Sequence, residues 1–249
     1  MSSPASEPSK AVLPPALQLR EIAGEITYFV LSLGIGILVT GLYEGIQSVL
    51  IGPSQKELSQ LLSIFNGPLA LTAAWLFYRW MGRHNEKTVV RPQFGIAQPP
   101  KPIFESTLDT LLGIVLSVVG SFVIANFFTL LGLEIEEQSK ILEIIQTGKV
   151  IDLVALSLSA LVFAPLVEEG LFRGLFFRRL LERVPAATAY FVSALVFALI
   201  HLNPSGILIY SWLGCVFAWT YQRSGRIGCA VLVHAGNNAA SLAVQLYIA

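Results

Sequence analysis

The chain has 249 residues, of which 54% are hydrophobic and only 13% are charged, and its formal net charge is zero. Because roughly a quarter of the residues in soluble domains are charged, this composition excludes an ordinary soluble domain and favours a membrane protein, with membrane lipids as its surroundings. Neither net positive charge nor a basic stripe with interleaved aromatic residues is present, so nucleic acid is not an expected partner.

Long apolar runs recur along the sequence and predict an all-α fold, a polytopic transmembrane helical bundle of about seven or eight spans, since one span needs about 20 mainly apolar residues. The runs are too long for the strands of a membrane barrel. In chain order, the candidate spans lie near residues 26–43, 61–78, 111–132, 150–167, 186–202, 207–221 and 227–248.

Three parts of the chain are expected. Residues 1–25 contain several prolines and lack the basic head and cleavage site of a signal peptide, so they are expected to form a flexible cytoplasmic tail. Residues 26–149 are expected to form an N-terminal three-helix membrane part with a cytoplasmic loop at 79–106. Residues 150–249 are expected to form a helical core, which holds most of the polar residues found in apolar sequence.

The distribution of Lys and Arg predicts the orientation in the membrane. Cytoplasmic loops carry an excess of these residues, and the loop at 79–106 is basic, whereas the loop before the fourth span is mainly acidic. The N-terminus is therefore expected on the cytoplasmic side. The basic residues of the loop are Arg79, Arg83, Lys87, Arg91 and Lys101.

The segment from residue 150 to Arg183 is interpreted as one long helix bent at Pro165. This arrangement places Arg178, Arg179 and Arg183 on the cytoplasmic side and leads to seven spans. If Glu168 instead begins a separate helix, the chain has eight.

Glu168, Glu169 and Arg173 lie within this apolar segment. Ionisable groups at bilayer depth cost at least a few kcal/mol each and indicate a functional site. Residues four apart share a helix face, so Glu169 is expected to pair with Arg173, while Glu168 points about 100° away. An unpaired Glu168 in a low-dielectric cavity suits a general base acting on water. The alternative is a satisfied ionic network without chemistry.

The backbone near Glu168 is also expected to be irregular. Pro165 lacks an N–H, so it should bend the helix and free a carbonyl near Leu161. Irregular backbone at membrane depth usually lines a cavity. The alternative is an ordinary transmembrane kink.

Later spans add a few further polar side chains. His201 lies near the end of the span at 186–202, with Phe197 one turn below to pack against its ring. His234 and Asn238 are four apart and present an imidazole and an amide along one helix face, which suits stabilisation of an oxyanion. The alternative is hydrogen bonding between helices as a packing device.

The ordered set of motifs resembles the three motifs of the CAAX protease and bacteriocin-processing (CPBP, or Abi) family of intramembrane proteases. The resemblance covers about residue 150 to the C-terminus, so residues 150–249 would be a catalytic CPBP-type helical core. The motifs are, in chain order, Glu168-Glu169-x-x-x-Arg173, Phe197-x-x-x-His201 and His234-x-x-x-Asn238.

The resemblance implies a CAAX-type intramembrane endopeptidase, a hydrolase of the glutamic or metallo type, acting on a peptide or prenylated protein. By position, Glu168 would activate water, His201 would assist or orient that water, and His234 with Asn238 would stabilise the oxyanion. Glu169 and Arg173 would support the site as an ion pair. The short loops and small size are typical of a bacterial member, in the plasma membrane.

No cofactor is favoured, although a divalent metal such as zinc is the second choice. Two histidines and a glutamate, here Glu168, His201 and His234, could hold Zn²⁺ with water as the fourth ligand. However, no H-E-x-x-H pair occurs on one helix, and Asn is a poor zinc ligand.

Two other classes of function would use the same residues. An ion-coupled carrier would use the buried polar groups as a relay, and would need a path through the bundle. A non-catalytic membrane immunity or scaffold protein would use them only to hold helices together. Glu168→Gln discriminates among the three classes, because a protease would lose cleavage, a carrier would lose flux and a scaffold would keep its effect.

Overall fold

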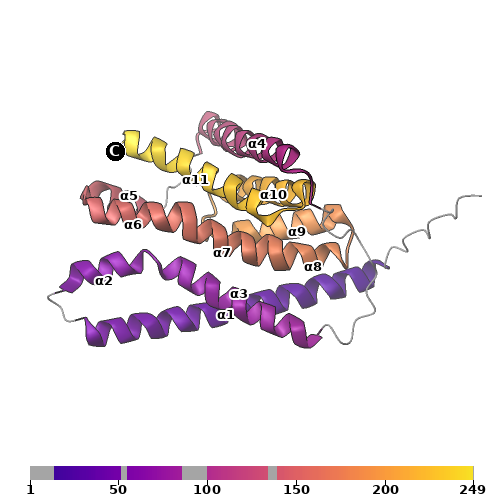
Figure 1. Cartoon of the computed structure of the whole chain (residues 1–249), viewed down its shortest axis with the longest axis horizontal. Helices are drawn as coiled ribbons and strands as arrows, with labels where there is room; N and C mark the ends of the chain where they lie inside the picture. The colour runs from indigo at the N-terminus through magenta and orange to yellow at the C-terminus, as the bar shows by residue number, and fades with distance from the viewer. Residues whose placement is uncertain (1–13, 52–54, 86–99, 134–138, 249) are drawn as a thin grey trace, which may run out of the picture.

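The computed structural model describes residues 14–51, 55–85, 100–133 and 139–248. Within these ranges every regular element is helical, which confirms the predicted all-α class (Figure 1). The elements are α1 Pro15–Leu50, α2 Lys56–Ser63, α3 Asn66–Asn85, α4 Ile103–Leu130, α5 Ser139–Thr147, α6 Val150–Leu158, the π-helical turn η2 Ser159–Phe163, α7 Ala164–Leu171, the π-helical turn η3 Phe172–Phe177, α8 Arg178–Leu181, α9 Ala186–Leu199, α10 Ile207–Ser224 and α11 Ile227–Ile248.

The helices have the length and apolarity of an integral membrane protein. Among the described residues, four helices are long and apolar enough to cross a membrane, namely Pro15–Leu50, Ile103–Leu130, Val150–Leu181 and Ile227–Tyr247. A fifth span results if α2 and α3, which are bent by 43° relative to each other, cross together as one broken helix. Of the two remaining predicted spans, the one at 186–202 coincides with the shorter apolar helix α9, and the one at 207–221 lies within α10, which is not among the helices apolar enough to cross.

The long segment that begins at Val150 is one continuous helix as far as Leu181, as predicted. Glu168 lies inside this helix, in α7, so it does not begin a separate span. Two π-helical turns interrupt the α-helical pattern, η2 ending at Phe163 shortly before Pro165 and η3 beginning at Phe172 shortly after the two glutamates. Turns of this kind are frequent at functional sites.

This continuous helix lies between two other groups of helices (Figure 1). On one side α1 and α3 pack against each other, and α3 contacts α7. On the other side α11 contacts α7 and η2, while α9 and α10 contact η3. The main contacts of α4 are with α10 and α11, so the three N-terminal spans do not form one packing unit.

Two predicted segment boundaries are corrected. The tail expected at residues 1–25 ends earlier, because α1 begins at Pro15, where proline suits the first helical turn; residues 1–13 lie outside the described residues. The loop expected at 79–106 is shorter, because α3 continues to Asn85 and α4 begins at Ile103. Residues 86–99 of that loop are also outside the described ranges.

A partly buried ionic cluster joins α1 and α3 to the segment that follows α8. Glu25 of α1 is 5% exposed and accepts a hydrogen bond from the hydroxyl of Tyr78 of α3. Arg183 lies 3.2 Å from Glu25 and, through its Nε, 3.2 Å from Glu21. These contacts tie α1 and α3 to the end of the helix that carries the two central glutamates.

Gly36 lies at a close approach of α1 and α3. A Cβ added there would overlap the backbone carbonyl of Ala70, which cannot move aside as a flexible side chain would. We expect Gly36→Ala to lower the free energy of unfolding by about 1–3 kcal/mol through overpacking, measured by thermal unfolding in detergent. Gly34→Ala is the matched control, because a Cβ at Gly34 meets nothing within 4 Å. Equal stability of the two variants would contradict the prediction.

Candidate active site

The polar residues of α7 are buried in the middle of the bundle. Glu168 is 9% exposed, while Glu169 and, at the start of η3, Arg173 are each fully buried. Burying three ionisable groups is costly unless they are paired or used. Their partners therefore define the site.

Glu169 is the centre of a hydrogen-bonded network. Its Oε1 accepts from Nη1 of Arg173 at 3.0 Å and lies 2.9 Å from Nδ1 of His234. Nη2 of Arg173 donates to the carbonyl oxygen of Gly214 at 2.9 Å. The ion pair expected between Glu169 and Arg173 is thus confirmed, and the structure adds His234 as a second partner of the same carboxylate.

Aromatic rings enclose the buried guanidinium. The Cζ of Arg173 lies 4.6 Å from the ring centroid of Phe197, 5.2 Å from that of Phe217 and 5.6 Å from that of Phe172. The negative faces of such rings attract a cation, more strongly when water is excluded. The rings therefore help to hold a charge that has no access to solvent.

Glu168 is bonded differently from its neighbour. Oε2 is buried without a hydrogen-bond partner in both glutamates, but Glu168, unlike Glu169, forms no hydrogen bond through its other oxygen either among the described residues. The nearest partner is Nε2 of His234, 4.0 Å away, which is beyond hydrogen-bonding distance. The expectation that Glu168 points away from Arg173 and remains unpaired agrees with this geometry.

His201 follows α9 and faces the same site. Its Nδ1 lies 2.7 Å from the carbonyl oxygen of Phe197. Because a carbonyl only accepts, Nδ1 carries the proton and Nε2 of the neutral ring is left as an acceptor. Phe197 also connects the two imidazoles, because its ring centroid lies 4.7 Å from that of His201 and 6.1 Å from that of His234.

Asn238 of α11 donates a side-chain hydrogen bond to the helix backbone near Pro165. In η2 the N–H of Ala164 bonds to the carbonyl of Ser159, five residues back. If Pro165 followed the same five-residue spacing, its N–H would bond to the carbonyl of Ala160, but proline has no N–H. The Ala160 carbonyl instead accepts a hydrogen bond from Nδ2 of Asn238 at 2.9 Å. The carbonyl freed by Pro165 is therefore that of Ala160, one residue from the predicted Leu161.

This contact predicts a coupling between Asn238 and Pro165. We expect Asn238→Ala to lower the free energy of unfolding by roughly 1–3 kcal/mol, because it leaves a partly buried carbonyl without a partner. In a Pro165→Ala background the new N–H can satisfy that carbonyl, so the loss should fall below about 1 kcal/mol. A double-mutant cycle by thermal unfolding measures both values. An equal loss in the two backgrounds would show that the two residues act independently.

The described side chains are not arranged as a set of metal ligands. Within the described ranges, no group of three or more His, Cys, Asp or Glu side chains is placed to hold a metal ion. Glu168, His201 and His234, the alternative ligand set, face one region without forming such a group.

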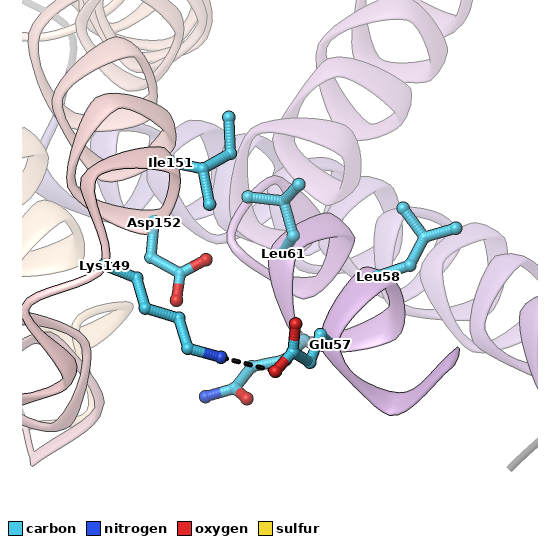
Figure 2. A pocket seen from close by; sticks show the side chains of 7 residues that line it. Glu57, Leu58, Leu61, Lys149, Ile151 and Asp152 are labelled. Carbon is cyan, nitrogen blue, oxygen red and sulfur yellow. Dashed lines mark hydrogen bonds and ion pairs between the residues drawn. The ribbon is translucent and has the colours of Figure 1, made fainter. Parts of the chain in front are cut away.

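A pocket of about 210 Å³ lies elsewhere, between α2 and the start of α6. Lys149 and Glu57 form an exposed ion pair of 2.7 Å at its rim (Figure 2). Exposed pairs of this kind contribute little to stability. None of the predicted site residues lines this pocket, so it is separate from the candidate site.

Three residues of α10 that the sequence did not indicate also contact the site. Gly214 accepts the bond from Arg173, Tyr210 stacks on His201 and Phe217 stacks on His234. None carries a charge, and no polar motif marks α10. In the sequence of α10, only the helical spacing of these three residues could have indicated that they lie on one face.

Fold and site together define a helical membrane protein with a buried cluster of Glu168, Glu169, Arg173 and His234, and with the half-buried His201 nearby. Comparison with known proteins agrees with this class. Residues 150–240 match the family described as "Type II CAAX prenyl endopeptidase Rce1-like", which confirms for this segment the family resemblance predicted from the three motifs. All the predicted site residues lie within the matched segment.

A relative supports the same assignment. The chain is 28% identical over 116 residues to "Putative membrane peptidase YdiL" of Bacillus subtilis (strain 168). The match covers 47% of this chain and 46% of that protein, so it spans about half the length of each. No solved structure matches the chain.

Proposed function

We propose that this protein is an intramembrane endopeptidase that hydrolyses a peptide bond with water activated by Glu168. One observation carries the proposal. Of two adjacent buried carboxylates, Glu169 is bonded through its Oε1 to Arg173 and His234, whereas Glu168 forms no hydrogen bond in the described part of the chain. A carboxylate held unpaired beside two imidazoles suits a general base.

The substrate that we propose is a peptide or prenylated protein at the membrane. The match to CAAX prenyl endopeptidases supports this class. We further propose a multi-pass topology in a bacterial plasma membrane with the N-terminus in the cytoplasm. The basic C-terminal ends of α3, α8 and α10 and the N-terminal end of α1 lie at one end of the bundle, which supports this orientation (Figure 1).

In the proposed first step, one water molecule is held by two acceptors. The water donates one hydrogen to the carboxylate of Glu168 and the other to Nε2 of His201. Nε2 of His201 can accept because Nδ1 carries the ring proton and donates it to the Phe197 carbonyl. A lone pair of the water oxygen is then directed at the scissile carbonyl carbon. Glu168 takes the proton as the carbon–oxygen bond forms, and later gives it to the leaving amine.

The oxyanion formed in this step needs hydrogen-bond donors. Glu169 accepts from Nδ1 of His234, so His234 can donate from Nε2 only as an imidazolium. Asn238 uses one Nδ2 hydrogen for the Ala160 carbonyl and keeps the other for the oxyanion.

A panel of quenched fluorescent peptides, prenylated and unprenylated, tests the proposal. Purified protein in detergent is compared with its Glu168→Gln variant, with and without a chelator. Cleavage that is lost in the variant but kept with the chelator is the expected result. Loss with the chelator would mean that a metal is required, and cleavage by Glu168→Gln would overturn the role of Glu168. If the wild-type protein cleaves no peptide, the scaffold function gains support.

A further inference from the structure

Helix α10 carries none of the predicted catalytic residues, yet one of its faces contacts three members of the site. Tyr210, Gly214 and Phe217 are spaced at i, i+4 and i+7, which places them along a single helix face. We refer to these three residues as the α10 face. Each of them touches a different polar residue of the site.

Tyr210 holds the ring of His201 from one side. The two rings are stacked, with centroids 4.0 Å apart and an interplanar angle of 24°. Phe197 lies 4.7 Å from the imidazole centroid at an angle of 56°, and its carbonyl binds Nδ1. The ring plane and one of its nitrogens are therefore both fixed, which determines where Nε2 points.

Phe217 holds the second imidazole in the same way. Its ring stacks on His234 with a centroid distance of 4.6 Å and an angle of 19°, while Nδ1 of His234 is bound to Glu169. Both histidines thus have one nitrogen hydrogen-bonded and one ring face covered by α10. In both cases Nε2 is the nitrogen left for substrate or water.

Gly214 sets the distance between α10 and the helix that precedes His201. A Cβ at Gly214 would lie 2.8 Å from Cα of Ala194 in α9, so only glycine permits this approach. The Gly214 carbonyl at the same point accepts from Arg173. The close contact of α9 and α10 brings Tyr210 within stacking distance of His201.

We propose that the α10 face is the positioning surface of the active site, and that Tyr210 is the positioning residue for His201. This inference rests on the proposed endopeptidase function. Tyr210 acts through its ring, which keeps Nε2 of His201 aimed at the water that Glu168 activates. Small displacements of such a group are expensive, since a shift of about 1 Å costs on the order of 100-fold in rate.

The test compares Tyr210→Leu, which removes the stacked ring, with Tyr210→Phe, which keeps it. With the peptide cleaved by the wild type, we expect kcat to fall roughly 10- to 100-fold in Tyr210→Leu, with KM nearly unchanged, because orientation and not binding is lost. Tyr210→Phe should restore a nearly wild-type kcat. A wild-type kcat in Tyr210→Leu would overturn the inference.

A second readout does not depend on cleavage. Diethyl pyrocarbonate labels neutral imidazoles, and mass spectrometry resolves the chain's three histidines, with His84 as the internal reference. The labelling rate of His201 relative to His84 should rise severalfold in Tyr210→Leu and stay at the wild-type value in Tyr210→Phe. Equal relative rates in all three proteins would overturn the positioning role even if no peptide is cleaved. Cleavage by Glu168→Gln, in contrast, would overturn the proposed catalytic function alone.

Discussion

Glu168→Gln is expected to reduce kcat by about 100- to 10,000-fold, the range that general-base catalysis contributes. Glutamine has nearly the same size but cannot take a proton from water. Glu168 forms no hydrogen bond with another side chain in the described part of the chain, so replacing it removes no native bond and should leave the thermal stability close to that of the wild type. The measurement is single-turnover cleavage of the best peptide, with thermal unfolding of the same preparation.

Glu169→Gln is the matched control, because it makes the same substitution one residue further on. Glu169 is bonded to Arg173 and His234, so the variant leaves a buried guanidinium without its counter-charge. We expect a clear loss of thermal stability from Glu169→Gln and none from Glu168→Gln. If both variants lose stability equally, the two carboxylates share one structural role, and the assignment of Glu168 as the base is wrong.

Arg173→Leu is expected to destabilise the protein by about 3–5 kcal/mol, the usual cost of removing one partner of a buried ion pair. Arg173 and Glu169 are both fully buried at 0% exposure, so water cannot replace the lost partner. The variant also loses the bond to the Gly214 carbonyl and the contacts with three aromatic rings. Thermal or denaturant unfolding in detergent measures the effect.

Arg178→Leu is the control for Arg173→Leu. Arg178 lies on the same continuous helix but is exposed, so its loss should change the free energy of unfolding by no more than about 0.5 kcal/mol. Arg173→Lys, which keeps the charge but cannot bind Glu169 and Gly214 with the same fork of donors, should fall between the two. Similar stability of Arg173→Leu and Arg178→Leu would contradict the account of the buried network.

Features that depend on neighbours along the chain could be predicted from the sequence. The membrane class follows from composition, and the helices follow from the apolar runs. The pairing of Glu169 with Arg173 and the contact of Phe197 with His201 follow from helical periodicity, since residues four apart share a face. The absence of a bond between Glu168 and Arg173 follows from the same geometry. These interactions are local, so the order of residues contains them.

Only the tertiary structure decided which helices meet around these residues. The bond from His234 to Glu169 joins residues 65 apart in the chain, and that from Asn238 to Ala160 joins residues 78 apart. The roles of Tyr210, Gly214 and Phe217 likewise depend on how closely α10 approaches its neighbours. Contacts of this kind are made by ordinary apolar residues whose partners are set by helix packing, and packing leaves no local signature in a single sequence.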